Sequence, residues 1–185
     1  MSHYQQRNDE GAHRIADDDP LALRLLKEEH QVFRTLFDQA NAADGKAVKP
    51  IGDELCMRLS VHMALEEELL YPALKPVIGA EEVNEGIVEH GAGKQLLAEI
   101  EQLTGEEELY KPKVHVLGEQ TIHHIDEEDE ELFADAKQAH AAGKIDLDAL
   151  GERLRARQAE LYDQIAAEGE LGPTHEAMME EVPTV

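Results

Sequence analysis

Two copies of one ligand-like pattern stand out in the sequence, each a histidine followed four residues later by a glutamate and preceded by a further histidine. The residues of the two copies are His30, His62, Glu66, His90, His124 and Glu128. Residues four apart in an α-helix lie on the same face, so each His-x3-Glu pair can present an imidazole and a carboxylate in one direction. Four imidazoles and two carboxylates form a nitrogen and oxygen ligand set that suits iron or manganese.

The size of this ligand set predicts two metal ions, because one ion rarely takes six ligands from a protein. If both carboxylates and a solvent-derived oxygen bridge the ions, about ten of twelve octahedral positions are filled. About two positions then remain for a small ligand.

An ordinary explanation of the pattern is a pair of surface ion pairs, since a single His-x3-Glu on a charged helix is usually solvated. Two copies with matching upstream histidines favour a site. The register comes from the internal repeat, which aligns residues 70–72 with 132–134 and thereby selects His124. Without the repeat, His123 with Glu127 would compete. The other acidic residues near the pattern, Glu67, Glu68 and Glu130, are interpreted as solvated surface.

Apolar residues at helical spacing predict the elements that must position these side chains. The expected helices run from about residue 20 to 42, 51 to 72, 81 to 104, 108 to 141 and 146 to 168, with a break or kink around Pro72 to Pro76. Gly91 and Gly93 lie inside the third helix, where they either allow close helix packing or leave room beside the metals.

Counting rise along these helices places the four histidines at one height. From His30 to the end of its helix is roughly 18 Å, and from the next helix start to His62 is roughly 17 Å. The distances are about 15 Å on both sides of the second turn, and about 21 and 20 Å around the third. The sequence therefore predicts an all-α fold, an up-down-up-down four-helix bundle with an additional C-terminal helix.

The chain is expected to comprise four parts. These are a flexible N-terminal arm (1–16), the bundle (17–142), the additional C-terminal helix (143–168) and a flexible acidic tail (169–185).

Composition narrows the range of partners. The formal charge of −24, from 41 acidic and 17 basic residues, disfavours nucleic acid and anionic membranes. Cys56 is the only cysteine, so no internal disulfide or thiolate cage can form. The polar N-terminus lacks a secretory pattern, and no apolar run is long enough to span a membrane. We expect a cytoplasmic protein whose partner is a small molecule.

These motifs resemble the hemerythrin-like, histidine-histidine-glutamate cation-binding family. The resemblance covers about residues 20 to 142 and rests on His30, HMALEEELLYP (62–72), His90 and HIDEEDEELF (124–133). It implies a four-helix bundle with a non-haem centre of two iron ions, oxo- or hydroxo-bridged. The six residues of the doubled pattern would hold these ions.

The sequence departs from the oxygen carriers of that family on the third helix. Carriers have a second histidine four residues from the first, whereas Gly86 and Lys94 flank His90 here. This difference indicates more open coordination than a carrier has. Carriers also use His-x4-Asp on the fourth helix, which Asp129 would satisfy, whereas the repeat favours Glu128. Tyr71 could offer a phenolate to ferric iron, but it lies about half a turn from the His62 face and is expected in the core or at its rim, unless Pro72 bends the helix enough to change its facing.

The function predicted from these features is a non-haem di-iron protein that binds, senses or reacts with a small oxidant: oxygen, nitric oxide or peroxide. By resemblance, its setting would be a stress or redox response. An enzymatic version is catalase-like peroxide disproportionation. The alternatives are an iron-binding, iron-donating or iron-sensing protein, and a structural bundle with incidental metal affinity. No protein partner is indicated.

Overall fold

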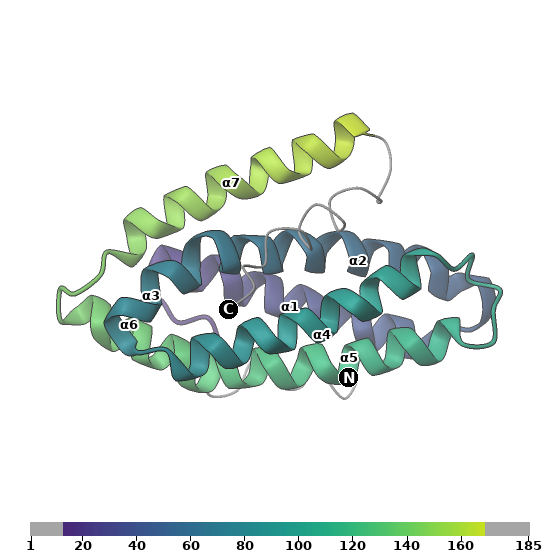
Figure 1. Ribbon diagram of the computed structural model, residues 1–185, viewed down its shortest axis with the longest axis horizontal. Coiled ribbons are helices and arrows are strands. Elements are labelled where there is room, and N and C mark those ends of the chain that lie inside the picture. Colours follow the sequence, from purple (N-terminus) through teal and green to yellow (C-terminus); the bar gives the residue numbers. More distant parts are fainter. Residues whose placement is uncertain (1–12, 169–185) are drawn as a thin grey trace.

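The computed structural model describes residues 13–168, and the regular elements in this range are all helical. Four long helical segments run alternately up and down, and a further helix lies across them (Figure 1). They are α1 (Leu21–Ala42), α2 (Val48–Leu65) with α3 (Tyr71–Ile78), α4 (Glu81–Glu101), α5 (Tyr110–Glu127) with α6 (Phe133–Ala141), and α7 (Leu147–Glu168). The predicted all-α bundle with an additional C-terminal helix is confirmed.

A π-helical turn interrupts each of the two helices that carry a His-x3-Glu pair. The turns are Glu66–Leu70, between α2 and α3, and Glu128–Leu132, between α5 and α6. Each begins at the glutamate of its pair. A π turn inserts one extra residue, so the side chains beyond it are rotated by about 100° relative to an unbroken α-helix.

The break expected around Pro72 to Pro76 is wrong in its position and kind. α3 runs through both prolines to Ile78. Pro72 stands in the first turn of α3, directly after the widened π turn, where a missing backbone N–H is tolerated.

The apolar core is divided into two clusters. One includes Leu26, Leu65, Leu74 and Leu132, and α7 adds to it Leu147, Leu150, Leu154 and Leu161. The other includes Phe33, Phe37, Leu55, Leu97 and Leu117 from α1, α2, α4 and α5. The predicted site residues belong to neither cluster, although they are buried within the same bundle. Their surroundings are therefore largely dry.

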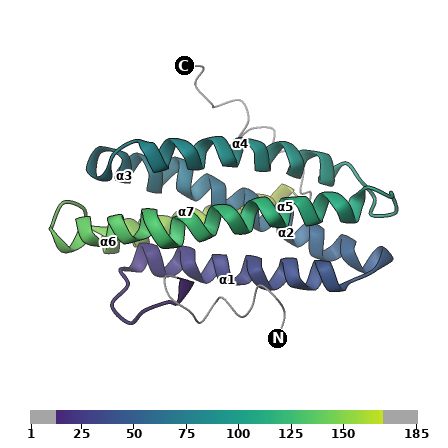
Figure 2. The same cartoon turned by 90° about the horizontal axis from the view of Figure 1, so that it is seen from below.

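α7 covers one face of the bundle, packing on α1, α2 and the first π turn (Figure 1). Gly151 lies so close to α1 that an added Cβ would be 2.6 Å from the backbone nitrogen of Ala22. Asp148 of α7 accepts a hydrogen bond from the backbone N–H of Leu21 at 2.9 Å, which caps α1. Figure 2 shows α5 between α1 and α4, with α7 behind. The α4–α5 face is thus left uncovered by α7.

Parts of the expected domain plan lie outside the described residues, namely 1–12 of the arm and the acidic tail 169–185. Of the arm, His13 is described. Its side chain is buried, with Nδ1 3.1 Å from Asp129 Oδ2.

We expect Gly151→Ala to lower the free energy of unfolding by about 1–3 kcal/mol, because the new methyl group would collide with the α1 backbone. Gly91→Ala is the matched control, since a Cβ there meets no atom within 4 Å. It should raise the free energy of unfolding by up to about 1 kcal/mol through helix propensity. Urea unfolding measures both. Equal stabilisation by the two variants would contradict the packing of α7 on α1.

Candidate metal centre

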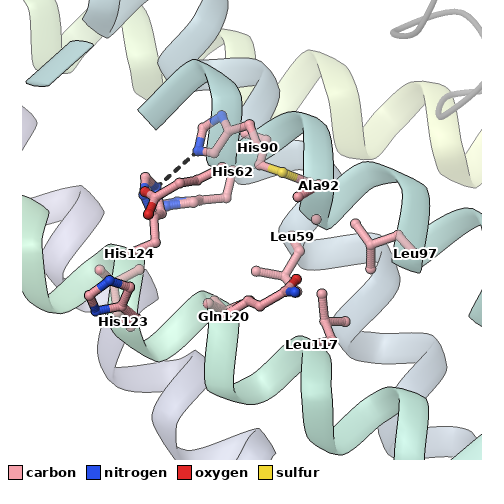
Figure 3. A pocket seen from close by; sticks show the side chains of 14 residues that line it. Leu59, His62, His90, Ala92, Leu97, Leu117, Gln120, His123 and His124 are labelled. Atoms are coloured by element: carbon pink, nitrogen blue, oxygen red, sulfur yellow. Dashed lines mark hydrogen bonds and ion pairs between the residues drawn. The ribbon is translucent and has the colours of Figure 1, made fainter. Parts of the chain in front are cut away.

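All six residues of the doubled pattern are buried and come together in the middle of the bundle. One group of ligand-capable atoms, within 4.8 Å of one another, comes from His30, His62, Glu66 and Glu128. A second group comes from Glu66, His90 and His124. Figure 3 shows His62, His90 and His124 pointing toward one another from three helices. Glu66 belongs to both groups.

The two carboxylates each join a histidine of one half of the sequence to a histidine of the other. His62 Nε2 lies 3.2 Å from Glu66 Oε1, and His90 Nε2 lies 3.3 Å from Glu66 Oε2. Glu128 Oε2 lies 3.6 Å from the Nε2 atoms of both His30 and His124. Each carboxylate thus lies between imidazole nitrogens from the two halves of the sequence.

Several polar atoms of the cluster are buried without a hydrogen-bond partner among the described residues. They are His30 Nε2, His62 Nε2, both oxygens of Glu66 and Glu128 Oε2. A buried polar group without a partner costs about 1–3 kcal/mol, and more if it is charged. Cations between these atoms would remove that penalty, so the donor set fits a metal centre.

The outer nitrogen of every histidine in the cluster faces a carboxylate. The Nδ1 distances are 3.0 Å for His30 to Asp129, 2.9 Å for His62 to Glu29, 3.0 Å for His90 to Glu67 and 2.7 Å for His124 to Glu89. When Nδ1–H donates to a carboxylate, Nε2 carries the lone pair and the ring is fixed in orientation. In that tautomer each neutral ring would offer its Nε2 lone pair toward the centre, where the Nε2 atoms of His90 and His124 lie 3.0 Å apart.

Glu29 and Glu89 were missed in the sequence, Asp129 was considered only as the alternative to Glu128, and Glu67 was wrongly interpreted as solvated surface. A second repeat would have identified them. Glu29 directly precedes His30 as Glu89 precedes His90, and an acidic residue follows each inner glutamate. The pattern is visible without a structure, but its meaning depends on which residues face each other between helices.

Asp129 and Glu128 occupy different positions around the cluster. Asp129 binds the outer nitrogen of His30, and it also accepts from Arg34 at 3.2 Å. Burial opposes ionisation of Asp129, but His30, His13 and Arg34 outweigh it and lower the pKa of its carboxyl group. Glu128 instead faces the inner nitrogens. The geometry favours Glu128 for the inner role that the sequence repeat assigns to it.

The protonation of the cluster is compatible with cation binding. Burial lowers the pKa of His90 to about 4, although Glu67 acts in the opposite direction. The imidazole is therefore uncharged near neutral pH. Burial raises the pKa of Glu66, and the neighbouring Glu128 carboxylate raises it further. In the metal-free protein Glu66 therefore tends to hold a proton, which a cation would displace.

Lys94 lies in an outer layer of the cluster. Its ammonium group donates to Glu67 at 2.6 and 2.8 Å, and Glu67 in turn binds His90. Arg34 is its counterpart in the other half, about 60 residues earlier, where it binds Asp129. Lys94, four residues after His90 where a second histidine would stand, thus holds the outer carboxylate of Glu67 with its ammonium group.

Tyr71 packs in the apolar core, as expected, but it also extends its hydroxyl group into the cluster. The hydroxyl donates to Glu128 Oε1 at 2.9 Å and lies 3.3 Å from His90 Nε2. The cause is the π turn before it, which rotates Tyr71 toward the histidines. Its counterpart Phe133 stacks on His30 with ring centroids 5.5 Å apart, so the two halves differ by one hydroxyl group.

Gly86 makes room for that hydroxyl group. An added Cβ at Gly86 would lie 2.7 Å from Tyr71 Oη and 3.4 Å from His124 Cε1. One of the two positions where the carriers could hold a second histidine is therefore adjacent to a tyrosine hydroxyl.

Comparison with known proteins identifies the family. The family model described as the hemerythrin HHE cation binding domain matches residues 21–136. The chain belongs to this family. A hemerythrin-like, cation-binding domain with histidine and glutamate clusters is thereby established, as the motifs indicated.

One curated relative of this hemerythrin-like chain is a DNA nickase from Nostoc sp. (strain PCC 7120 / SAG 25.82 / UTEX 2576), 24% identical over 111 residues. The alignment covers 60% of this chain and 32% of the nickase, so the chain spans about a third of that relative. No solved structure matches significantly. Within the described part of the chain, no helix has the length and apolar character needed to cross a membrane.

Two openings reach the cluster of this hemerythrin-like domain. A cavity of about 230 Å³ between α2, α4 and α5 ends at His62, His90 and His124 (Figure 3). A smaller opening of about 60 Å³ reaches His124 and Glu128, and its other lining residues are Glu82, Glu85, Gly86, Glu89, Glu127, Glu131 and Leu132. One opening is mainly apolar and the other is acidic.

The competing pair His123 and Glu127 lies outside the buried cluster. His123 is exposed, and its Nε2 lies 3.4 Å from Glu127 Oε1 at the surface.

The fit between Tyr71 and Gly86 predicts a strong coupling between the two positions. Gly86→Ala should destabilise the metal-free protein by about 1–3 kcal/mol, because the methyl group overlaps the tyrosine hydroxyl. Tyr71→Phe removes that oxygen and should recover much of the loss in the double variant. A double-mutant cycle by urea unfolding measures the coupling. Simple additivity would contradict this packing.

Proposed function

We propose that this chain is a non-haem di-iron protein that binds, senses or reacts with a small oxidant such as oxygen, nitric oxide or peroxide. The observation that carries the proposal is the set of buried nitrogen and oxygen atoms without hydrogen-bond partners among the described residues, within a cluster whose side chains come from four helical segments. The ligands in this proposal are His30, His62, Glu66, His90, His124 and Glu128.

Two ions fit the cluster better than one. Its atoms form two groups that share Glu66, and each group includes histidines from one half of the sequence. Neutral imidazoles and carboxylates suit iron. A thiolate is not available, because burial raises the pKa of the Cys56 thiol and this residue packs in the apolar core.

Iron ions held here would supply redox-active Lewis acids with open positions for a small ligand. The chain supplies the remaining functions. The outer carboxylates orient the imidazoles, and the apolar cavity limits water. Burial and Glu128 raise the pKa of Tyr71, so its hydroxyl group stays protonated. The hydroxyl donates a hydrogen bond to Glu128 and lies beside His90.

In this proposal the partner is a small molecule, the protein is cytoplasmic, and the chain has the four parts expected from its sequence. Nicking of DNA is not extended to this chain, because a net charge of −24 opposes contact with phosphates. A stress or redox role is proposed by family resemblance.

Iron handling is the second candidate, and the acidic opening favours it. Its carboxylates lead from the surface to Glu128, whose Oε2 has no hydrogen-bond partner among the described residues. Such a lining attracts cations. A donor or iron sensor would release iron readily to a chelator.

Iron content tests the ligand assignment. We expect about two irons per chain in the wild type, since two groups of ligand atoms are present. A His62→Ala, His124→Ala double variant should lose them, and Glu128→Ala should lose at least one. Asp129→Ala should weaken affinity by about 10–100-fold while still loading at high iron, because Asp129 acts through His30. Elemental analysis at controlled free iron measures these contents. If Asp129→Ala loses its iron while Glu128→Ala loads fully, Asp129 is the inner ligand and Glu128 the outer carboxylate, contrary to the assignment.

Reaction with oxidants separates the functional versions. Prompt oxygen evolution from added peroxide would support the enzyme. A spectral change of the reduced protein with oxygen or nitric oxide, without turnover, would support the sensor. We expect at least one such response, and an iron-loaded protein inert to all three oxidants would contradict the proposal.

A further inference from the structure

The apolar cavity beside the histidines is larger than a diatomic molecule or hydrogen peroxide requires. Its volume is about 230 Å³. A water-sized molecule takes roughly 30 Å³ of liquid volume, and an apolar cavity of roughly 150 Å³ holds benzene. The cavity therefore has room for a small organic molecule.

The lining of the cavity changes in character from one end to the other. His62, His90 and His124 form one end, and Leu59, Leu97 and Leu117 lie at the other (Figure 3). Met63 and Ile125 add further apolar surface, whereas Gln120 and Thr121 add polar groups. A ligand that matches this lining has an apolar body and one polar group, placed at the histidines.

Charge and access restrict the ligand further. Among the described residues, the lining holds one carboxylate, Glu89, which is paired with His124, and no lysine or arginine that could bind a ligand carboxylate, so it suits a neutral molecule. α7 covers the α1–α2 side of the bundle, whereas the cavity lies between α2, α4 and α5. A neutral molecule would enter beside α4 and α5.

Gly93 keeps part of this cavity free. Its missing side chain borders the cavity, and an added Cβ would meet only Met63 Sδ at 3.8 Å, an ordinary contact. Close helix packing was one interpretation of Gly91 and Gly93. It explains neither of them, because Gly91 also has open space around its Cβ position.

We propose that the cavity binds a small neutral organic hydroperoxide, with its peroxide group at the histidines and its hydrocarbon body among the leucines. This inference rests on the proposed function, because iron at the histidines is what makes a peroxide the fitting polar group.

The test uses 2-phenyl-2-propanol, an alcohol with the carbon skeleton of cumene hydroperoxide and no O–O bond, so binding is measured without turnover. Calorimetric titration of the full-length, iron-loaded protein should give saturable binding with a Kd of about 1 mM or below. Amide signals of α4 and α5 should shift in NMR spectra of the metal-free protein.

Gly93→Leu is the decisive variant, because leucine fills the cavity and favours a helix over glycine. It should weaken binding of the alcohol about tenfold or more, with unchanged iron content. Gly91→Leu is the matched control, two residues away at an exposed position that does not line the cavity, and should bind as the wild type does.

Two outcomes would overturn the inference: no saturable binding to the wild type, or equal binding by Gly93→Leu. Failure of the proposed function is distinguishable. A wild-type protein that loads iron and responds to nitric oxide yet ignores the alcohol refutes only this inference. A protein that binds the alcohol through the Gly93 cavity but takes up no iron supports the pocket and refutes the di-iron proposal.

Discussion

Two carboxylates are buried among four imidazoles, and several of their inner atoms have no hydrogen-bond partner among the described residues; the rest of the structure depends on this constraint. These atoms are buried from solvent, so a missing hydrogen bond at any of them is costly. Ionisation of both carboxylates in one dry space is unfavourable, and the raised pKa of Glu66 reflects burial and the nearby Glu128. A bound cation would stabilise the ionised carboxylates and satisfy the buried atoms that have no hydrogen-bond partner among the described residues.

The two halves of the sequence contribute equivalent layers around this cluster, and the differences between them show how it is approached. Glu29 holds His62 and receives a hydrogen bond from Gln158 of α7 at 2.6 Å. Its counterpart Glu89 holds His124 but lines both openings instead. The helix that follows the bundle therefore closes one side of the centre and leaves the other side accessible. The second difference is the hydroxyl group of Tyr71, which its counterpart Phe133 in the other half lacks.

Much of this arrangement could be predicted from the sequence, since helix periodicity and rise per residue place the four histidines at one height without knowledge of packing. The π turns could not, because the helices that follow them have only 8 and 9 residues, too few for a one-residue shift of the apolar pattern to be recognised. Glu67 and Glu89 resembled ordinary acidic surface, because whether a carboxylate faces a histidine depends on the neighbouring helix. The contact between His13 and Asp129 could not be predicted for a similar reason, because residues 116 positions apart leave no local signal in the sequence.

The most direct test of the central claim, that this buried cluster is a two-cation site, is anomalous diffraction at the iron edge from crystals of the iron-loaded protein. The account predicts two peaks roughly 3.5 Å apart, as in known two-metal sites. One peak should lie among His30, His62, Glu66 and Glu128, and the other beside His90 and His124. A single peak, or iron bound at the exposed His123 with the inner cluster empty, would contradict it.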